Sequence, residues 1–255
     1  AALNYTPMME QYREVKKQHP QDLLMFRLGD FYELFFDDAE LAARELEITL
    51  TSREAGNNVR VPMCGVPYHA VDGYLTRLIA KGYRVAICEQ MEDPRQAKGI
   101  VKREVVRVVT PGTILSEPAL TDRGNNYIAL AYEEGAELAL AAADVSTGEF
   151  LWSLFGETDR YAALLDQLSR LSPAELVITG KLDRWNEMER FLQARLGGCT
   201  VTNFANASMD CWRELPTKHF TGGEIPAEPA ALAAVGQLLQ YLHQTLKSDL
   251  SHVNH

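Results

Sequence analysis

An aromatic ring and a carboxylate lie two residues apart in the segment GDFYELFF, at Phe31 and Glu33. In an extended segment, Phe31 and Glu33 point to one face, and Tyr32 and Leu34 point to the other, which we expect to be the core. An exposed aromatic ring can enter a base step from the minor groove and kink the duplex. This costs on the order of a few kcal/mol per intact step and less where pairing is defective. The pair therefore suits detection of weak base pairing, whereas the alternative places Phe31 in the core and Glu33 in solvent.

The carboxylate beside the ring needs a reason of its own, because it repels phosphates. Glu33 becomes useful if it hydrogen-bonds a base edge, and its charge then also disfavours normally paired duplex. A basic segment, Pro94–Arg107, is opposed only by Glu104 and is suited to phosphates if it forms an extended hairpin. The alternative for this segment is a charged edge strand that blocks aggregation. Its cations, which with Phe31 and Glu33 make up the predicted DNA-binding residues, are Arg95, Lys98, Lys102, Arg103 and Arg107.

Signatures of catalysis and metal binding are missing from the sequence. It contains no GxxxxGK[ST], GxGxxG, HExxH or GxSxG motif, and its four cysteines include no CxxC pair, as is typical of reduced cytosolic thiols. Asp144 ends a predicted strand, but a single carboxylate cannot hold the two metal ions of a nuclease. Glu175 and Glu187 are interpreted as exposed surface acids. We predict that Asp144 opens the turn DVSTG, and we expect neither a metal site nor a catalytic residue.

Composition is that of an ordinary globular protein, with 255 residues, 46% hydrophobic and 24% charged. The formal net charge of -10 is uneven: 15 basic and 16 acidic residues fall in the first 111, which leaves 10 and 19 for the remainder. A basic surface is thus expected only on the first half, and the acidic second half suits protein contacts better. The N-terminus has no signal-peptide layout, and no apolar run approaches the roughly 18–20 residues of a membrane span, so no membrane partner is expected.

Two mixed α/β units should position these residues. In the first, residues 1–110, Thr6 and Pro7 open a helix, strands are expected at 48–51 and 59–63 around a turn at 53–58, and a helix is expected at 69–81. Residues 111–126, with two prolines and two glycines, form the predicted linker. In the second unit, residues 127–226, three strands precede alternating helices and strands, which is the order of the RNase H-like fold. Residues 227–255 carry an apolar helical stripe that either begins a truncated helical domain or packs back on the second unit.

Five motifs resemble the MutS family of DNA mismatch repair proteins. They occur in order as TPMMEQY (6–12), GDFYELF (29–35), PMCGVPYHA (62–70), AICEQ (86–90) and VVRVVTPGT (105–113). The resemblance implies a mismatch-recognition domain, an RNase H-like connector domain without nuclease activity, and the start of a helical lever domain. It also implies that Phe31 stacks on a mispaired or unpaired base from the minor groove while Glu33 hydrogen-bonds that base.

The same resemblance implies partners and a location. Mismatched double-stranded DNA and MutL are the expected partners, in the cytoplasm. The family's ATPase, with ATP and Mg²⁺, and its homodimer interface are expected downstream of this chain, which should therefore bind no cofactor and have no enzymatic activity. Two alternatives stay open: an RNase H-like metal-dependent nuclease that uses Asp144, and a module that only binds other proteins.

Overall fold

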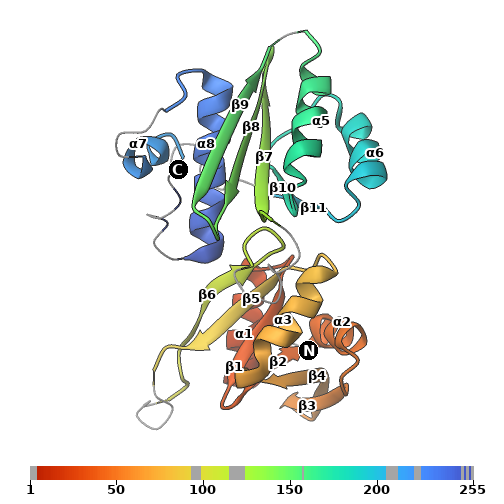
Figure 1. Ribbon diagram of the computed structural model, residues 1–255. Helices are drawn as coiled ribbons and strands as arrows, with labels where there is room; N and C mark the ends of the chain where they lie inside the picture. The colour runs from red at the N-terminus through yellow and green to blue at the C-terminus, as the bar shows by residue number, and fades with distance from the viewer. Residues whose placement is uncertain are drawn as a thin grey trace. The chain divides into compact units, whose positions relative to one another are not determined.

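The computed structural model describes residues 5–92, 99–114, 124–156, 158–204, 212–220, 225–247, 250 and 253. The chain divides into two compact units, Ala1–Thr110 and Pro111–His255. None of the helices in these ranges is both long and apolar enough to cross a membrane. Each unit is built on its own mixed sheet (Figure 1).

Unit 1 contains a six-stranded sheet in the order β3-β4-β2-β1-β5-β6. Strands β1 and β5 are parallel, and every other neighbouring pair is antiparallel. Strands β5 and β6 pair antiparallel, as the two strands of a hairpin would, and residues 93–98 between them lie outside the described part of the chain. The strand bounds are β1 Leu23–Leu28, β2 Phe31–Phe35, β3 Thr51–Gly56, β4 Val59–Pro67, β5 Val85–Gln90 and β6 Arg103–Val109.

Helices cover both faces of this sheet. On one face Met9 and Tyr12 of the first helix pack against Phe26 and Phe35. On the other face lies Cys64, whose thiol hydrogen-bonds the backbone of the second helix, and burial raises the pKa of this thiol to about 11. Thr6 caps the first helix as predicted, because its Oγ1 accepts a hydrogen bond from an amide of the first turn. The helix bounds are α1 Pro7–Gln18, α2 Phe36–Leu46, η1 Tyr68–Ala70 and α3 Val71–Ala80.

The β3–β4 hairpin differs from the sequence prediction. The strand expected at 48–51 begins only at Thr51 and continues to Gly56, through most of the predicted turn. The reversal is confined to Asn57 and Asn58, with φ of 50° and 59°, a left-handed conformation that asparagine tolerates. Strand β4 extends to Pro67, beyond the predicted end at residue 63, because it pairs with both β3 and β2.

Unit 2 has the predicted RNase H-like strand order, β11-β10-β7-β8-β9. The first three strands form an antiparallel meander, and β10 is parallel to both β7 and β11. Helices α5 and α6 cover one face of this sheet, and α8 covers the other (Figure 1). The bounds are β7 Tyr127–Glu134, β8 Glu137–Asp144, β9 Glu149–Phe155, α5 Arg160–Leu171, β10 Glu175–Ile178, α6 Trp185–Arg195, β11 Thr200–Asn203, α7 Leu215–His219 and α8 Pro229–Leu246.

Helix α8 packs back on unit 2, the second of the two outcomes expected for residues 227–255. It lies against β7 and β8, where Ala139, Ala141 and Ala143 alternate toward it. Alanine side chains let the helix approach closely, and the sheet face opposite α5 and α6 would otherwise expose its apolar residues. The domain boundary predicted at residue 227 therefore does not coincide with an end of the compact unit.

The predicted linker 111–126 is also partly built into unit 2. The amide of Gly112 donates to Glu175, and Asn126 donates its side-chain amide to the carbonyl of Pro111. Thr113 and Ile114 are buried. The first residues of the segment thus belong to the second core, while residues 115–123 lie outside the described part of the chain.

Candidate nucleic-acid interface

Phe31 lies at the start of β2, directly after the turn from β1. Leu28 pairs with Phe31 across this hairpin, and Gly29 makes the reversal possible with a φ of +60°. Tyr32 and Leu34 are buried, and Phe31 remains 47% exposed. The alternation expected from the sequence is confirmed, and the interpretation of Phe31 as a core residue is wrong.

Arg27 and Tyr68 brace the turn that carries this ring. The Nε of Arg27 donates to the carbonyl of Gly29 at 2.5 Å, and its guanidinium lies 3.7 Å from the centre of the Tyr68 ring. The Tyr68 amide in turn donates to the carbonyl of Asp30 at 2.9 Å. A cation held over an aromatic face adds to these hydrogen bonds. The backbone on both sides of the turn is therefore fixed before any ligand arrives.

Glu33 lies on the same face of β2 as Phe31, with its side chain 15% exposed. Its carboxylate forms an ion pair with the guanidinium of Arg53, on β3. Gly65 is its partner on β4, and a Cβ there would lie 3.5 Å from Glu33 Cγ and 3.8 Å from Phe31 Cδ1. Arg53 is absent from the site predicted from the sequence, since residues 53–58 were expected to form a turn.

Of the predicted basic residues, the structure describes three, and these three differ in exposure. Arg95 and Lys98 lie outside the described residues. Arg107 is exposed on the edge strand β6. Lys102 is exposed but forms an ion pair with Glu104 at 2.6 Å, and the hydrogen bond from this pair raises the pKa of Lys102. Both side chains are exposed, but Glu104 offsets the charge of Lys102.

The prediction that Arg103 contacts a phosphate is corrected by the structure, because this side chain is buried. Its Nε donates to the carbonyl of Arg27 at 2.7 Å, and its Nη1 donates to Gln11 and to the carbonyl of Val101, both at 3.0 Å. The guanidinium lies 5.1 Å from the centre of the Phe26 ring, and burial lowers the pKa of Arg103. Its donors are used inside unit 1, so this side chain ties α1 and β1 to the edge strand.

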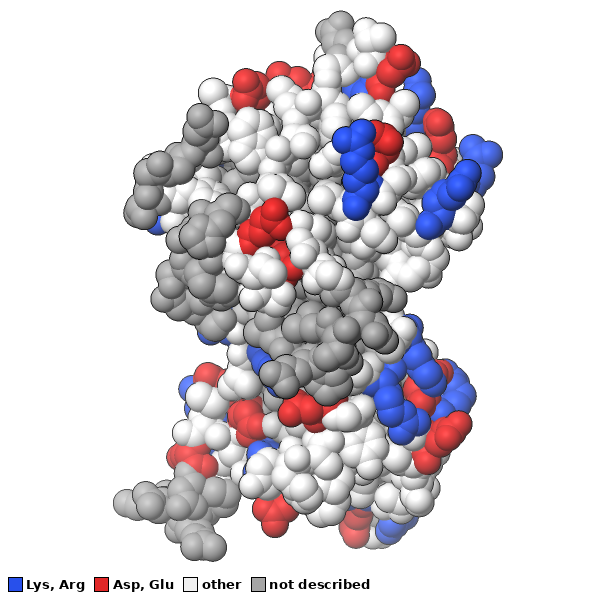
Figure 2. Space-filling model, in the orientation of Figure 1, with Lys and Arg blue, Asp and Glu red and all other residues white. Residues whose placement is uncertain are grey.

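Several other cations of unit 1 are paired with acids. Figure 2 shows basic side chains gathered over α2 and α3, with acidic side chains among them. Here Lys81 and Arg44 both form ion pairs with Glu45, at 3.0 Å and 3.2 Å. Glu45 offsets only one of these two positive charges, so the group attracts a duplex less strongly than its two cations alone would.

The acids of unit 2 serve its structure. Both oxygens of the buried Asp144 are occupied: Oδ1 accepts from the amide and hydroxyl of Ser146, and Oδ2 accepts from the amide of Asn126. The predicted turn is confirmed. Glu175 is buried rather than exposed, which corrects the prediction, while Glu187 is exposed as expected. Within the described ranges, no three His, Cys, Asp or Glu side chains gather as a metal site would require.

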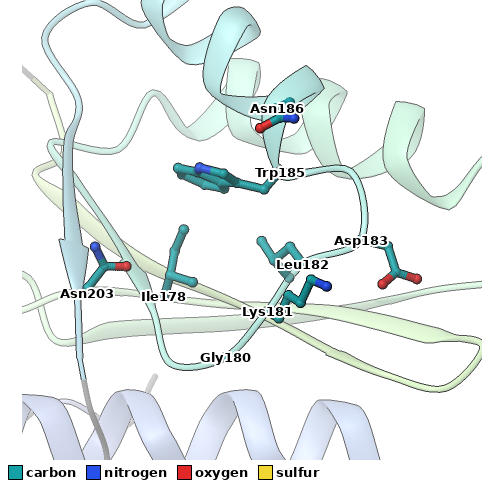
Figure 3. Close-up of a pocket in the computed structure, with 8 residues that line it drawn as sticks. All are labelled: Ile178, Gly180, Lys181, Leu182, Asp183, Trp185, Asn186 and Asn203. Carbon is teal, nitrogen blue, oxygen red and sulfur yellow. The ribbon is translucent and has the colours of Figure 1, made fainter.

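Unit 2 also carries a pocket of about 510 Å³ at the carboxyl ends of β10 and β11, the edge of a parallel sheet where ligands often bind. Figure 3 shows the indole of Trp185 above the strands. Among the described lining residues Asp183 is the one carboxylate, and a two-metal centre of the kind nucleases use needs several. The lining residues are Ile178, Gly180, Lys181, Leu182, Asp183, Trp185, Asn186 and Asn203.

Comparison with known proteins identifies both units. The family model described as MutS domain I matches residues 6–118, and the model described as MutS domain II matches residues 126–254, a range that includes α8. The DNA mismatch repair protein MutS of Pelotomaculum thermopropionicum is 48% identical over 256 residues, and that of Ruminiclostridium cellulolyticum is 45% identical over 252. Each match covers 97% of this chain, which spans 29% of the relative's length. The chain therefore belongs to the MutS family and contains its domains I and II.

Proposed function

We propose that this protein recognises mismatched or unpaired bases in double-stranded DNA, with Phe31 inserted from the minor groove and Glu33 hydrogen-bonded to the displaced base. The observation that carries the proposal is the position of Phe31, a large apolar ring 47% exposed on a strand whose next residues are buried. The turn before the ring is braced by Arg27, so little conformational entropy is lost when the ring inserts.

The energetics favour insertion of the ring at a mispaired base step over insertion at a normally paired one. Stacking on an aromatic side chain contributes about 1–3 kcal/mol per base, and opening an intact step costs on the order of a few kcal/mol. These terms nearly cancel for paired DNA. At a mismatch the opening cost falls while the stacking gain remains, so insertion becomes favourable. Specificity then arises from deformability, as in other indirect readout, and few base contacts are required.

Glu33 adds a second check on the displaced base. A carboxylate accepts hydrogen bonds, so it can pair with a base N–H that has lost its normal partner. Its negative charge would repel nearby phosphates, but the ion pair with Arg53 offsets part of that repulsion. Phosphate contacts from exposed cations such as Lys102 and Arg107 supply affinity without regard to sequence.

The wider activity belongs to the full-length protein. We propose that it binds MutL, forms a homodimer, hydrolyses ATP with Mg²⁺ through a domain beyond this chain, and acts in the cytoplasm. The relatives named as mismatch repair proteins and the family resemblance support these proposals. The two domains in this chain would then contribute recognition, and we expect no catalysis from them.

The test compares duplexes with and without one mismatch. In the full-length protein, Phe31→Ala should reduce the ratio of the two affinities by roughly 5- to 150-fold, the equivalent of one stacked base. Leu50→Ala is the matched control, because this apolar side chain is also 47% exposed in unit 1. Fluorescence anisotropy with labelled duplexes gives both affinities.

The fold must survive for this result to be informative. Half of the Phe31 ring is already in solvent, so its loss should cost only about 1 kcal/mol of stability. An unchanged affinity ratio in a folded Phe31→Ala protein would contradict the proposal. It would favour the alternative in which the exposed ring contacts another protein.

A further inference from the structure

We propose that Arg53 is a positioning residue for Glu33, and that it sets how strongly a mispaired base is distinguished from a paired one. This inference rests on the proposed function, because it assigns the ion-pair partner of the carboxylate that checks the base. Arg53 is therefore expected to act through Glu33 rather than through a contact of its own with the base.

The sheet brings these two side chains together across an intervening strand. Arg53 on β3 pairs with Val61, and Glu33 on β2 pairs with Gly65, so β4 lies between them. The arginine side chain reaches diagonally over β4 to the carboxylate. The guanidinium Nη1 donates to Glu33 Oε2, and the two side chains are 39% and 15% exposed, respectively.

A second guanidinium lies near this ion pair and has other partners. Arg103 is the other guanidinium close by: burial lowers its pKa, and the charge of Arg53 lowers it further. In the sheet order, Glu33 on β2 lies between Arg53 on β3 and Arg103 on β6. Arg103 donates instead to the carbonyls of Arg27 and Val101, and Arg53 is the guanidinium bonded to Glu33.

Two consequences follow for DNA binding. An unpaired glutamate samples many rotamers, and ordering it at the moment of binding would weaken the hydrogen bond to the base. An ion pair fixes the rotamer in advance, which helps only where a base edge is available to the carboxylate. The ion pair also offsets the repulsion between Glu33 and phosphates, which affects paired and mismatched duplexes alike. Arg53 should therefore change the ratio of the two affinities, as a simple phosphate contact would not.

A double-mutant cycle in the full-length protein tests this assignment. Arg53→Gln should reduce the ratio of mismatched to paired affinity by roughly 3- to 30-fold, and it should leave the ratio unchanged in a Glu33→Gln background. Arg53→Lys should restore part of the ratio, because lysine keeps the charge but loses the planar fork of donors. Arg60→Gln is the matched control, since Arg60 on β4 is exposed and bonded to Ser52 instead.

The possible results separate the explanations. Equal weakening of both duplexes by Arg53→Gln, persisting with Glu33→Gln, would overturn the inference and make Arg53 a phosphate contact. A lower melting temperature with an unchanged affinity ratio would also overturn it and leave a structural role only. If Glu33→Gln alone left the ratio unchanged, the role proposed for Glu33 would fall together with that of Arg53, whereas Phe31→Ala reports on ring insertion separately.

Discussion

The buried carboxylate of Glu175 supports the sharpest stability prediction for this protein. Its Oε1 accepts hydrogen bonds from Thr202 Oγ1 at 2.7 Å and from the hydroxyl of Tyr241 at 2.6 Å. Its Oε2 accepts from the Gly112 amide at 3.1 Å. One side chain on β10 therefore joins β11, α8 and the first residues of unit 2. We predict that Glu175→Leu strongly destabilises unit 2.

The magnitude follows from the three donors that lose their acceptor. Each buried donor left unsatisfied costs about 1–3 kcal/mol, but the hydroxyls of Thr202 and Tyr241 can turn toward other acceptors. We therefore expect a loss of about 2–4 kcal/mol, more than one unsatisfied donor would cost on average and less than all three would. Tyr241→Phe removes a single donor and should cost about 1–2 kcal/mol.

Urea unfolding, monitored by tryptophan fluorescence, measures this loss of stability in unit 2. The three tryptophans, Trp152, Trp185 and Trp212, all lie in unit 2, so their emission follows its unfolding alone. Glu187→Leu is the control, because this acid is exposed and its replacement should change stability by no more than about 0.5 kcal/mol. A Glu175→Leu protein as stable as the wild type would refute the reasoning, since it would mean that desolvation of the carboxylate outweighs its hydrogen bonds.

Two further predictions concern the first residues of unit 2 and the stability of unit 1 at acidic pH. Gly112→Ala should destabilise unit 2 by about 1–3 kcal/mol in urea titrations, because the new Cβ would lie 2.6 Å from the Cβ of Ile128. Unchanged stability would mean that the backbone around Gly112 can shift freely. Burial opposes ionisation of Asp22, yet hydrogen bonds and charge from His19 and Arg84 give it a net lowered pKa. The stabilising contribution of the Asp22 carboxylate is thus complete above its ordinary pKa of about 3.9 and is lost as pH falls through the lowered pKa. Asp22→Asn should therefore flatten the acidic part of the pH dependence of stability, measured by unfolding curves with circular dichroism detection. An unaltered pH profile would contradict the assignment.

Short-range patterns in the sequence were sufficient for the alternation of side chains in β2 and for the succession of strands and helices along unit 2. The facing of Phe31, Tyr32 and Leu34 follows from alternation alone, because consecutive side chains of a strand point to opposite faces. The cap at Thr6 and the turn at Asp144 likewise depend on atoms only a few residues away. Such features are local, so the residue types in one segment determine them.

Contacts between segments far apart in the sequence determined which charged residues are buried, which of them pair, and where α8 packs. Residue type indicates exposure for Arg103 and Glu175, yet both are buried, because main-chain carbonyls and hydroxyls from other elements satisfy them. The pairing of Arg53 with Glu33 depends on which strand separates β2 from β3, and the place of α8 depends on which sheet face is left uncovered. The free energy of a buried charge is set by partners that folding brings together, and those partners are far apart along the chain.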